Sequence, residues 1–514
     1  MSDNSLREAK EASHSGEAAA TTPVTDIEHG SMATGVASKG YKIGPLTLPL
    51  YRSPLAQTII IGFVCFLVVG MFNVLASLGG GGQLDATLSN EANIILYSVF
   101  AGVALVSGSI CNYLGPKITL SVGGVGYALY AASFWCYNHT QNRGFVLFSG
   151  AACGFAAAFL WTAEGTILMS YPTEDQKGRY ISLFWTIWSM GAVIGSIIPT
   201  AQNWSNTSAG RVNDGTYIAL FVLMLAGSVL ALCLVHPNKV VRDDGTKVYM
   251  VQHASLLTEL KNIARSVVVE PWIVLFFPYA FAGLWYGVYQ SNDYNAYFFD
   301  VRTRAFNSIW YNVAQMVSAG LLGLFLDIKY FTRRTRALLG WALMFVLFNA
   351  VLIGGVFPLR ESSRDHPVAK ILDVTDNKAG GYIALYFFYG FLDGAWQCYA
   401  YWIMGTLSNN PLVLSMYGAF YKVFGAAGSA IVASLDEDKK SYVTMFASYW
   451  GLTAGSLLIL LPLVLKRVTN TSMPVEVPSA RMVGAGGPQA GIAVGVDMEI
   501  EGEEKEQELK HTVI

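Results

Sequence analysis

Long apolar segments recur along the 514-residue chain and constrain its fold more than any other feature. A helix needs about 20 mostly apolar residues to cross a bilayer. Twelve segments meet this requirement. They cover residues 56–78, 92–114, 118–137, 144–170, 178–201, 216–236, 272–290, 308–326, 336–357, 379–404, 414–434 and 441–465. The pattern therefore predicts an all-α membrane protein with twelve transmembrane helices.

Charged residues are scarce, which agrees with a lipid environment. They make up 13% of the chain, against about 25% in typical soluble proteins. A net charge of -2 gives no reason to expect a nucleic-acid partner, so the lipid bilayer is the main expected partner. The six cysteines show no metal-ligand spacing, and no catalytic triad or nucleotide-binding motif is found. We expect no metal, no cofactor and no enzymatic activity, and the sequence indicates no oligomeric state.

A polar stretch separates the first six apolar segments from the last six. Its second part places Leu256, Leu260 and Ile263 on one helical face, which predicts an amphipathic helix at the membrane surface. The predicted domains are a disordered cytoplasmic tail over 1–50, a six-helix bundle over 51–236, a cytoplasmic linker over 237–270, a second six-helix bundle over 271–467 and a disordered acidic tail over 468–514.

Loop charge predicts the orientation in the membrane. With the N-terminus in the cytoplasm, most loop Lys and Arg residues fall on the inner side, as the positive-inside rule requires. Three Asn-x-Ser/Thr sequons, at Asn138, Asn203 and Asn206, then fall in outer loops and are predicted glycosylation sites. We expect a multi-pass protein of the plasma membrane or an endomembrane, with both termini cytoplasmic.

A related loop occurs at the same place in each half. Each copy has a glycine, a polar residue four positions later and then basic residues, which suggests a contact that forms and breaks as two bundles move. The alternative is an ordinary basic inner loop. The proposed gating residues are Gly108, Asn112, Gly115 and Lys117 in the first copy, and Gly323, Asp327, Arg333 and Arg334 in the second.

This loop resembles the signature Gly-x-x-x-Asp-x-x-Gly-Arg-Lys of the major facilitator superfamily, with Asn112 and Pro116 as departures. Two further stretches resemble the uncoordinated-93-like branch, most of all its fungal members. They contain Trp161, Thr162, Gly165, Gly178, Phe184 and Trp185 in the first case, and Gly390, Asp393, Trp396 and Gln397 in the second. The resemblance covers roughly residues 50–465. It implies two pseudo-symmetric six-helix bundles, but no substrate, because animal relatives include proteins thought to regulate or escort other membrane proteins.

Three ionisable residues lie inside predicted helices, where a charge costs at least about 2.5–3.5 kcal/mol. They are Glu164, Asp393 and Lys422. In one interpretation Glu164 faces a central cavity and holds a proton at rest, because burial disfavours its charged form, while Asp393 and Lys422 form a switchable ion pair. In the other, Asp393 and Lys422 are a static brace, and Glu164 bonds to a hydroxyl or to Arg179.

Aromatic and amide side chains crowd the same depth. Those facing a cavity would suit a bulky, partly apolar substrate, whereas the others would be ordinary interface anchors or interhelical bonds. We include Trp161, Trp396, Gln397, Asn73 and Gln315 in the predicted substrate or proton pathway. Gly191, Gly195 and Pro199 predict a close-packing face and a hinge in the fifth helix.

The leading functional hypothesis is a secondary active transporter. It would move a small organic molecule by alternating access, with proton coupling and metabolite efflux as open options. The alternative is a non-transporting regulator or trafficking partner of a channel or receptor, and an ion channel subunit is a third hypothesis.

Overall fold

The computed structural model describes residues 41–43, 46–83, 86–172, 177–208, 210–242, 248, 271–328, 330–365, 371–407 and 411–470. In these ranges, ten helices are long and apolar enough to cross a membrane. The helices α3 (Thr87–Ala104) and α15 (Ala379–Leu407) complete the predicted set of twelve. The all-α membrane fold is therefore confirmed.

The N-terminal half contains the first six crossings. They are α1 (Pro54–Cys65) with η1 (Phe66–Gly70) and α2 (Met71–Ser77); α3 with α4 (Ser107–Leu114); α5 (Pro116–Thr140); α6 (Arg143–Ser170); α7 (Lys177–Gly195) with α8 (Ile197–Asn203); and α9 (Asp214–Ala231). The short helices η2 (Gly80–Gly82) and η3 (Pro237–Lys239) lie in connecting segments.

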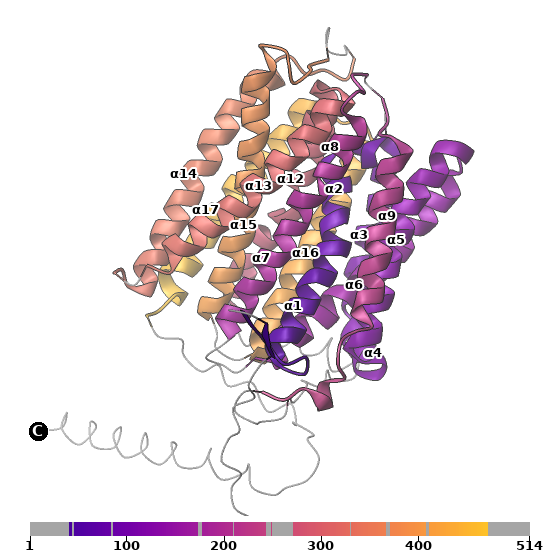
Figure 1. Ribbon diagram of the computed structural model, residues 1–514. Helices are drawn as coiled ribbons and strands as arrows, with labels where there is room; N and C mark the ends of the chain where they lie inside the picture. Colours follow the sequence, from indigo (N-terminus) through magenta and orange to yellow (C-terminus); the bar gives the residue numbers. More distant parts are fainter. Residues whose placement is uncertain are drawn as a thin grey trace, which may run out of the picture. The chain divides into compact units, whose positions relative to one another are not determined.

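The C-terminal half contains the other six. They are α11 (Ile273–Phe281) with η4 (Ala282–Leu284), α12 (Tyr286–Val288) and η5 (Tyr289–Ala296); α13 (Val301–Leu326); α14 (Arg333–Leu359); α15; α16 (Pro411–Glu437); and α17 (Tyr442–Arg467). Figure 1 shows α14, α15 and α17 on one side and α5, α6 and α9 on the other, with α7 and α16 between them.

Side-chain caps explain where several helices begin. The Oγ of Ser53 accepts a hydrogen bond from the Ala56 amide at 3.3 Å, directly before Pro54. The side chains of Asn142 and Ser441 cap α6 and α17 in the same way. Each cap satisfies an amide that the first helical turn leaves without a partner. For these three helices the predicted starts agree with the structure to within two residues.

The predicted close-packing face of the fifth crossing is confirmed. A Cβ on Gly191 would lie 2.6 Å from the carbonyl oxygen of Phe66, so only glycine allows this approach. The helix is interrupted at Ser196, between α7 and α8. Pro199 lacks the amide hydrogen that would bond to the Gly195 carbonyl, which accounts for the interruption.

The first crossing of each half contains a π-helical segment. In the N-terminal half it is η1, between α1 and α2, and in the C-terminal half it is η5, after α12. π-Helical segments inside helices are rare and are frequent at functional sites. The two halves therefore share a backbone irregularity in equivalent helices, which the hydropathy pattern did not reveal.

Two hydrophobic cores follow the division into halves. One is built from buried residues between Ile273 and Val468, and the other from residues between Ile61 and Val248. Val301, Ala305 and Ala426 of the C-terminal half also pack into the second core. Between the halves, α3 packs against α16, and α7 packs against α13.

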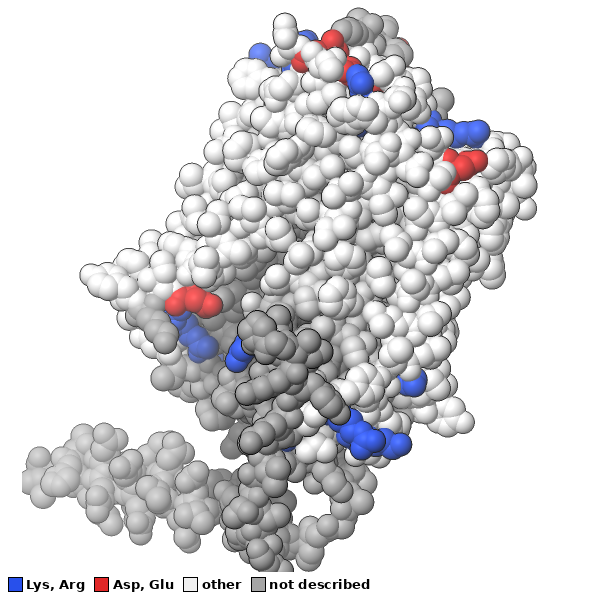
Figure 2. Space-filling model, in the orientation of Figure 1, with Lys and Arg blue, Asp and Glu red and all other residues white. Residues whose placement is uncertain are grey.

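Charged side chains gather at the two ends of the helices. Figure 2 shows Lys, Arg, Asp and Glu at these ends, with a broad uncharged band between them. Large apolar residues within the helices are exposed, among them Val229, Val346 and Phe357, at 63–67%. An apolar surface of this kind suits contact with lipid. The protein is an integral, multi-pass membrane protein.

Some predictions for the tails and the linker change or fall outside the described residues. Part of the predicted disordered N-terminal tail forms a two-stranded hairpin, β1 (Tyr41–Ile43) paired with β2 (Leu46–Leu48), with Tyr41 opposite Leu48. The predicted amphipathic helix in the linker and the acidic tail beyond residue 470 lie outside the described residues.

We expect Gly394→Ala to lower the free energy of unfolding by about 1–3 kcal/mol, the usual cost of overpacking. A Cβ at this position would overlap the Gln315 carbonyl oxygen and the Ser318 hydroxyl on α13. A Cβ on Gly405, in the same helix, would meet no described neighbouring atom within 4 Å, so Gly405→Ala is a matched control that should be neutral or stabilising. Unfolding in detergent measures both, and equal effects would contradict the prediction.

Candidate functional site

An ion pair joins the two halves inside the membrane. Glu164 on α6 is buried, and its Oε2 lies 3.7 Å from the Nζ of Lys422 on α16. The prediction that Lys422 pairs with Asp393 was therefore wrong. Glu164 is also bonded neither to a hydroxyl nor to Arg179 in the described contacts, because Lys422 takes that place. The physical reason is the packing of α16 on the N-terminal half, which brings Lys422 to α6.

Aromatic rings surround this pair. The Lys422 ammonium lies 4.1 Å from the centre of the Trp161 ring, a cation–π distance. Trp188 contacts Trp161 edge-on at 5.6 Å, and Trp185 contacts Trp188 at 4.5 Å. Trp185 also contacts Tyr401 of the C-terminal half at 5.2 Å. We call the group of Glu164, Lys422, Trp161, Trp185, Trp188 and Tyr401 the cross-half cluster.

Asp393 lies within the C-terminal half and is held by hydroxyl and amide groups. The hydroxyls of Tyr286 and Tyr311 and the Nε2 of Gln315 are bonded to its carboxylate, the last two at 3.0 Å. These donors come from α12 and α13, and α15 packs on α13. A buried carboxyl is usually paired with a cation or fully hydrogen-bonded, and Asp393 uses hydrogen bonds. We call these four residues the Asp393 cluster.

The Asp393 cluster extends through two glutamines. The Tyr311 hydroxyl also bonds to the Gln290 side chain at 2.8 Å, and Gln290 bonds to Tyr449 at 2.9 Å. On the other side, Gln397 donates to the Tyr286 hydroxyl at 3.0 Å and accepts from Tyr421 at 2.8 Å. Since Tyr421 precedes Lys422 in α16 and its ring meets Tyr401 at 5.8 Å, the two clusters adjoin.

Two residues of the predicted pathway lie elsewhere. Trp396 is fully buried in the C-terminal core, where its ring stacks on Tyr279 at 3.9 Å. These contacts favour a packing role, and its place in the pathway stays a prediction. Asn73 is half-buried in α2 and makes none of the contacts that define either cluster.

A buried arginine closes one end of the interface between the halves. Arg304 on α13 donates from Nε to the Leu78 carbonyl at 2.9 Å and from Nη2 to the Gly79 carbonyl at 2.8 Å. A further bond reaches the Gly210 carbonyl at 3.3 Å. Gly79 has a φ of 74°, a conformation that other residues rarely adopt, and a Cβ there would overlap the Ser291 carbonyl. The glycine loop and Arg304 therefore fit each other.

Other polar contacts cross the halves at the same end. Ser77 bonds to Ser308, and its carbonyl accepts from the Tyr386 hydroxyl at 3.0 Å. Asn90 donates to the Asp436 carboxylate at 2.6 Å, and Arg364 also bonds to that carboxylate. Together with Arg304, these residues form what we call the outer seal, since the predicted orientation places it outside.

The loop beside the outer seal contains Asp373, whose carboxylate stays charged over a wide pH range. Arg302 donates from Nε to the Asp373 carboxylate at 2.9 Å. Burial acts to raise the pKa of Asp373, but hydrogen bonds from Arg302 and Thr375 outweigh it and hold the pKa well below its usual range. A carboxyl group with a lowered pKa stabilises the fold until the pH falls through that pKa. The contact between Asp373 and Arg302 should therefore persist in mild acid.

The predicted gating loops are placed at the opposite end. Gly115 joins α4 to α5 with a φ of 77°, which explains the need for glycine there. Asp327 is exposed at the end of α13, and Arg336 near it donates to the Leu326 carbonyl at 2.5 Å rather than to Asp327. The Asn112 side chain lies outside the described part, and the gating role of these loops stays a prediction.

Comparison with known proteins now places the chain in a family. The sequence profile described as "Ion channel regulatory protein UNC-93" matches residues 88–457. The chain belongs to the UNC-93 family. UNC93-like protein C922.05c of Schizosaccharomyces pombe is 44% identical over 85% of this chain and 87% of that protein. UNC93-like protein 1 of Arabidopsis thaliana is 38% identical over 82% of this chain and 92% of that protein.

Solved structures show the same fold as this UNC-93 family member. The fucose:proton symporter FucP of E. coli matches with a TM-score of 0.51 and 16% identity, over 81% of this chain and 98% of that one. The inward-open xylose transporter XylE of E. coli matches with a TM-score of 0.54 and 11% identity, over 81% and 96%. The predicted major facilitator fold is confirmed.

Burial separates the predicted glycosylation sites. Asn203 is 1% exposed and donates to the Pro199 carbonyl and the Thr216 hydroxyl, and Asn138 is 7% exposed and bonded to Asp214. Neither amide has room for a glycan in the folded protein, so these two predictions are corrected. Asn206 is only half-buried and lies in the loop before α9.

We expect Asn206→Gln to abolish any glycosidase-sensitive mass shift of this UNC-93 family member, because Asn206 is the accessible sequon of the three. Gel mobility with and without glycosidase measures the shift. Asn203→Gln serves as the matched control and should leave the shift intact. A shift that survives Asn206→Gln but disappears in the control would contradict the placement.

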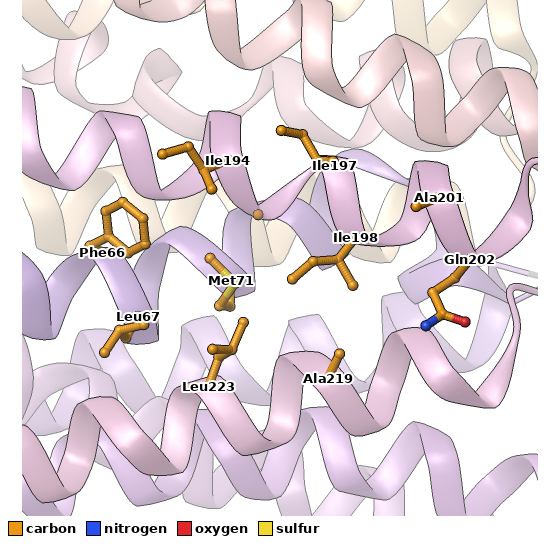
Figure 3. Close-up of a pocket in the computed structure, with 11 residues that line it drawn as sticks. Phe66, Leu67, Met71, Ile194, Ile197, Ile198, Ala201, Gln202, Ala219 and Leu223 are labelled. Atoms are coloured by element: carbon orange, nitrogen blue, oxygen red, sulfur yellow. The ribbon is translucent and has the colours of Figure 1, made fainter.

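A separate cavity of about 590 Å³ lies between η1, α7, α8 and α9. Its lining is apolar apart from Gln202 at one end (Figure 3). Ile194 and Ile197 on its rim are 46% and 53% exposed, so it opens on a lipid-facing surface. A polar substrate finds few partners there, and we therefore place the candidate site at the cross-half cluster and the Asp393 cluster.

Proposed function

We propose that this protein is a secondary active transporter that moves a small organic molecule by alternating access. The observation that carries the proposal is the Glu164–Lys422 pair. It connects α6 of one half to α16 of the other in the interior of the membrane, where an ion pair is costly to keep. A substrate or a proton can break an ion pair between the two halves. A purely structural contact has no need to be breakable.

The outer seal supports alternating access. Arg304, Ser77 and Asp436 hold the halves together at one end through direct hydrogen bonds. A transporter must break such a seal to load or release from that side, and close it again while the other side opens. The fold shared with a fucose:proton symporter and a xylose transporter agrees with this cycle.

We further propose that a proton gradient drives the cycle. Glu164 and Asp393 are carboxyl groups inside the membrane, and each contacts groups that sense its charge. Lys422 faces Glu164, and Tyr311 faces Asp393. Loss or gain of one proton at either site would rearrange these contacts, which can link proton movement to the motion of the halves. We retain the predicted orientation, with both termini in the cytoplasm.

A second candidate function follows from the family itself. The matching profile is described as an ion channel regulatory protein, so the chain can instead be a regulator that keeps the facilitator fold. In that case the cross-half cluster would be a static brace. The prediction that separates the two functions is flux, because a regulator moves no substrate but binds a partner protein.

The test is uptake by reconstituted vesicles against a library of metabolites, with an imposed proton gradient. A transporter shows saturable flux and counterflow, and Glu164→Gln should remove the dependence on the gradient. Gln202→Leu, in the lipid-facing cavity, is the control that should leave flux unchanged. Absence of flux for the wild-type protein, with co-purification of a channel or receptor, would overturn the proposal in favour of a regulator.

A further inference from the structure

The Glu164–Lys422 pair is loose. The separation of 3.7 Å exceeds the 2.7–3.2 Å of an N–H···O hydrogen bond. The Lys422 side chain is 25% exposed, whereas that of Glu164 is 7% exposed. Lys422 therefore reaches a buried carboxylate from a more open side, without the close hydrogen bonding that makes buried ion pairs strong.

The groups around the ammonium form a site for a cation. Glu164 supplies a negative charge, and the Trp161 ring, 4.1 Å away, supplies an aromatic face. Carboxylates and indole faces together recognise organic ammonium groups.

The charges near this site are unequal. The two clusters contain two carboxyl groups, Glu164 and Asp393, but a single lysine, and Asp393 is held by neutral donors. When both carboxyl groups are ionised, a ligand that brings a positive charge balances them, whereas an anionic ligand adds to the excess of negative charge.

We propose that the substrate is an organic cation, an amine with an apolar body. In the protein without substrate, the Lys422 ammonium occupies the position that the substrate's ammonium group takes when it binds. This inference rests on the proposed transport function and names its substrate class. When a substrate ammonium takes the place of Lys422 beside Glu164 and over Trp161, Lys422 leaves α6. Binding therefore removes the Lys422 contact between α16 and α6, while the packing of α16 on α3 and the Asn90–Asp436 hydrogen bond remain. Occupancy of the site thereby weakens the attachment of the two halves to each other.

The test uses Lys422→Ala, which vacates the ammonium position, and n-butylammonium chloride as the probe. Purified Lys422→Ala should show a saturable rise in melting temperature with n-butylammonium that sodium chloride does not produce. Lys422→Met fills the same space with an apolar chain and should show no rise. The double variant Glu164→Gln/Lys422→Ala should also show none, because the carboxylate that attracts the cation is gone.

Outcomes other than these overturn the inference. Stabilisation of the wild-type protein by sodium butyrate, lost in Lys422→Ala, would mean that Lys422 binds an anionic ligand. Equal rises in the single and double variants would mean that the amine binds elsewhere. Should Lys422→Ala not fold, the same titrations are carried out on the wild-type protein and followed by tryptophan fluorescence. n-Butylammonium should then change the fluorescence of the wild-type protein but not that of Glu164→Gln. Amine binding without any flux in vesicles would leave the cation site standing and reject transport, whereas flux of non-cationic substrates alone would reject the substrate class.

Discussion

Glu164→Gln is expected to lower the free energy of unfolding by about 3 kcal/mol, at the low end of the cost of breaking a buried ion pair. The substitution leaves the Lys422 ammonium in the membrane interior beside a neutral amide, with the Trp161 ring as its remaining charge-sensitive partner. Chemical unfolding in detergent micelles measures the change. A surface pair provides the comparison: Glu91→Gln, opposite the exposed Arg143, should cost at most about 1 kcal/mol.

A double-mutant cycle separates the pair from the effects of each residue alone. Lys422→Met removes the ammonium, and in its presence Glu164→Gln no longer strands a charge. The double variant should therefore be more stable than the sum of the single effects predicts, by about 0.5–3 kcal/mol. The same coupling should appear in proton-driven flux. Additive effects on both stability and flux would mean that the two side chains do not interact, and the cross-half cluster would lose its role.

The two acids could be found from the sequence, but not the way they are paired. A carboxylate inside an apolar segment costs enough free energy that Glu164 and Asp393 stand out. Which lysine reaches which acid depends on how α16 lies against the N-terminal half, and hydropathy contains no information on contacts between helices. Asp393 and Lys422 have similar predicted depths, which suggested a pair. The structure instead surrounds Asp393 with Tyr286, Tyr311 and Gln315.

The twelve helices were predictable because the bilayer forces every crossing to be long and apolar. Irregularities inside these helices were harder to predict from the sequence. Gly191, Gly195 and Pro199 signalled the interruption between α7 and α8, since glycine and proline have direct backbone effects. The π segments η1 and η5 had no comparable signal, because packing against neighbouring helices decides them. Tyr311 has no sequence signal for a related reason: tyrosine is common in membrane helices, and only its contacts place it in the candidate site.

Arg304 shows how an error in a helix boundary can hide a buried residue that joins the two halves. Hydropathy predicts that the eighth apolar segment begins at residue 308, which leaves Arg304 in the loop before it. In the structure α13 begins at Val301, and Arg304 is buried with an exposed fraction of 3%. Asp300 caps this helix by accepting from the Thr303 amide at 2.8 Å. The cap extends the helix toward the glycine loop and carries the guanidinium to the carbonyls of Leu78 and Gly79.

Arg304→Met is expected to open the outer seal. Methionine keeps much of the side-chain bulk but donates no hydrogen bond, so the carbonyls of Leu78 and Gly79 lose a charged donor. Hydrogen bonds to charged groups contribute about 1.5–3 kcal/mol each, so the loss should favour conformations in which the halves separate at this end. Ser308, fully buried beside Ser77, is the reporter position. In a Cys136→Ser/Cys233→Ser background, which removes the exposed Cys233 as well, Ser308→Cys should be unreactive toward an impermeant thiol reagent until Arg304→Met is added.

Two controls tell opening of the seal from general unfolding. Arg360→Met removes a different arginine at the same end, one whose contact with the Phe357 ring at 5.9 Å lies within the C-terminal half, and it should leave Ser308→Cys unreactive. The buried Cys153 of the N-terminal core reports unfolding, and it should stay unreactive in both variants. Labelling of Cys153 together with the reporter thiol would mean that Arg304→Met unfolds the protein. Absence of labelling at the reporter position would mean that Arg304 does not hold the halves together, because the remaining bonds of Ser77 and Asp436 then suffice.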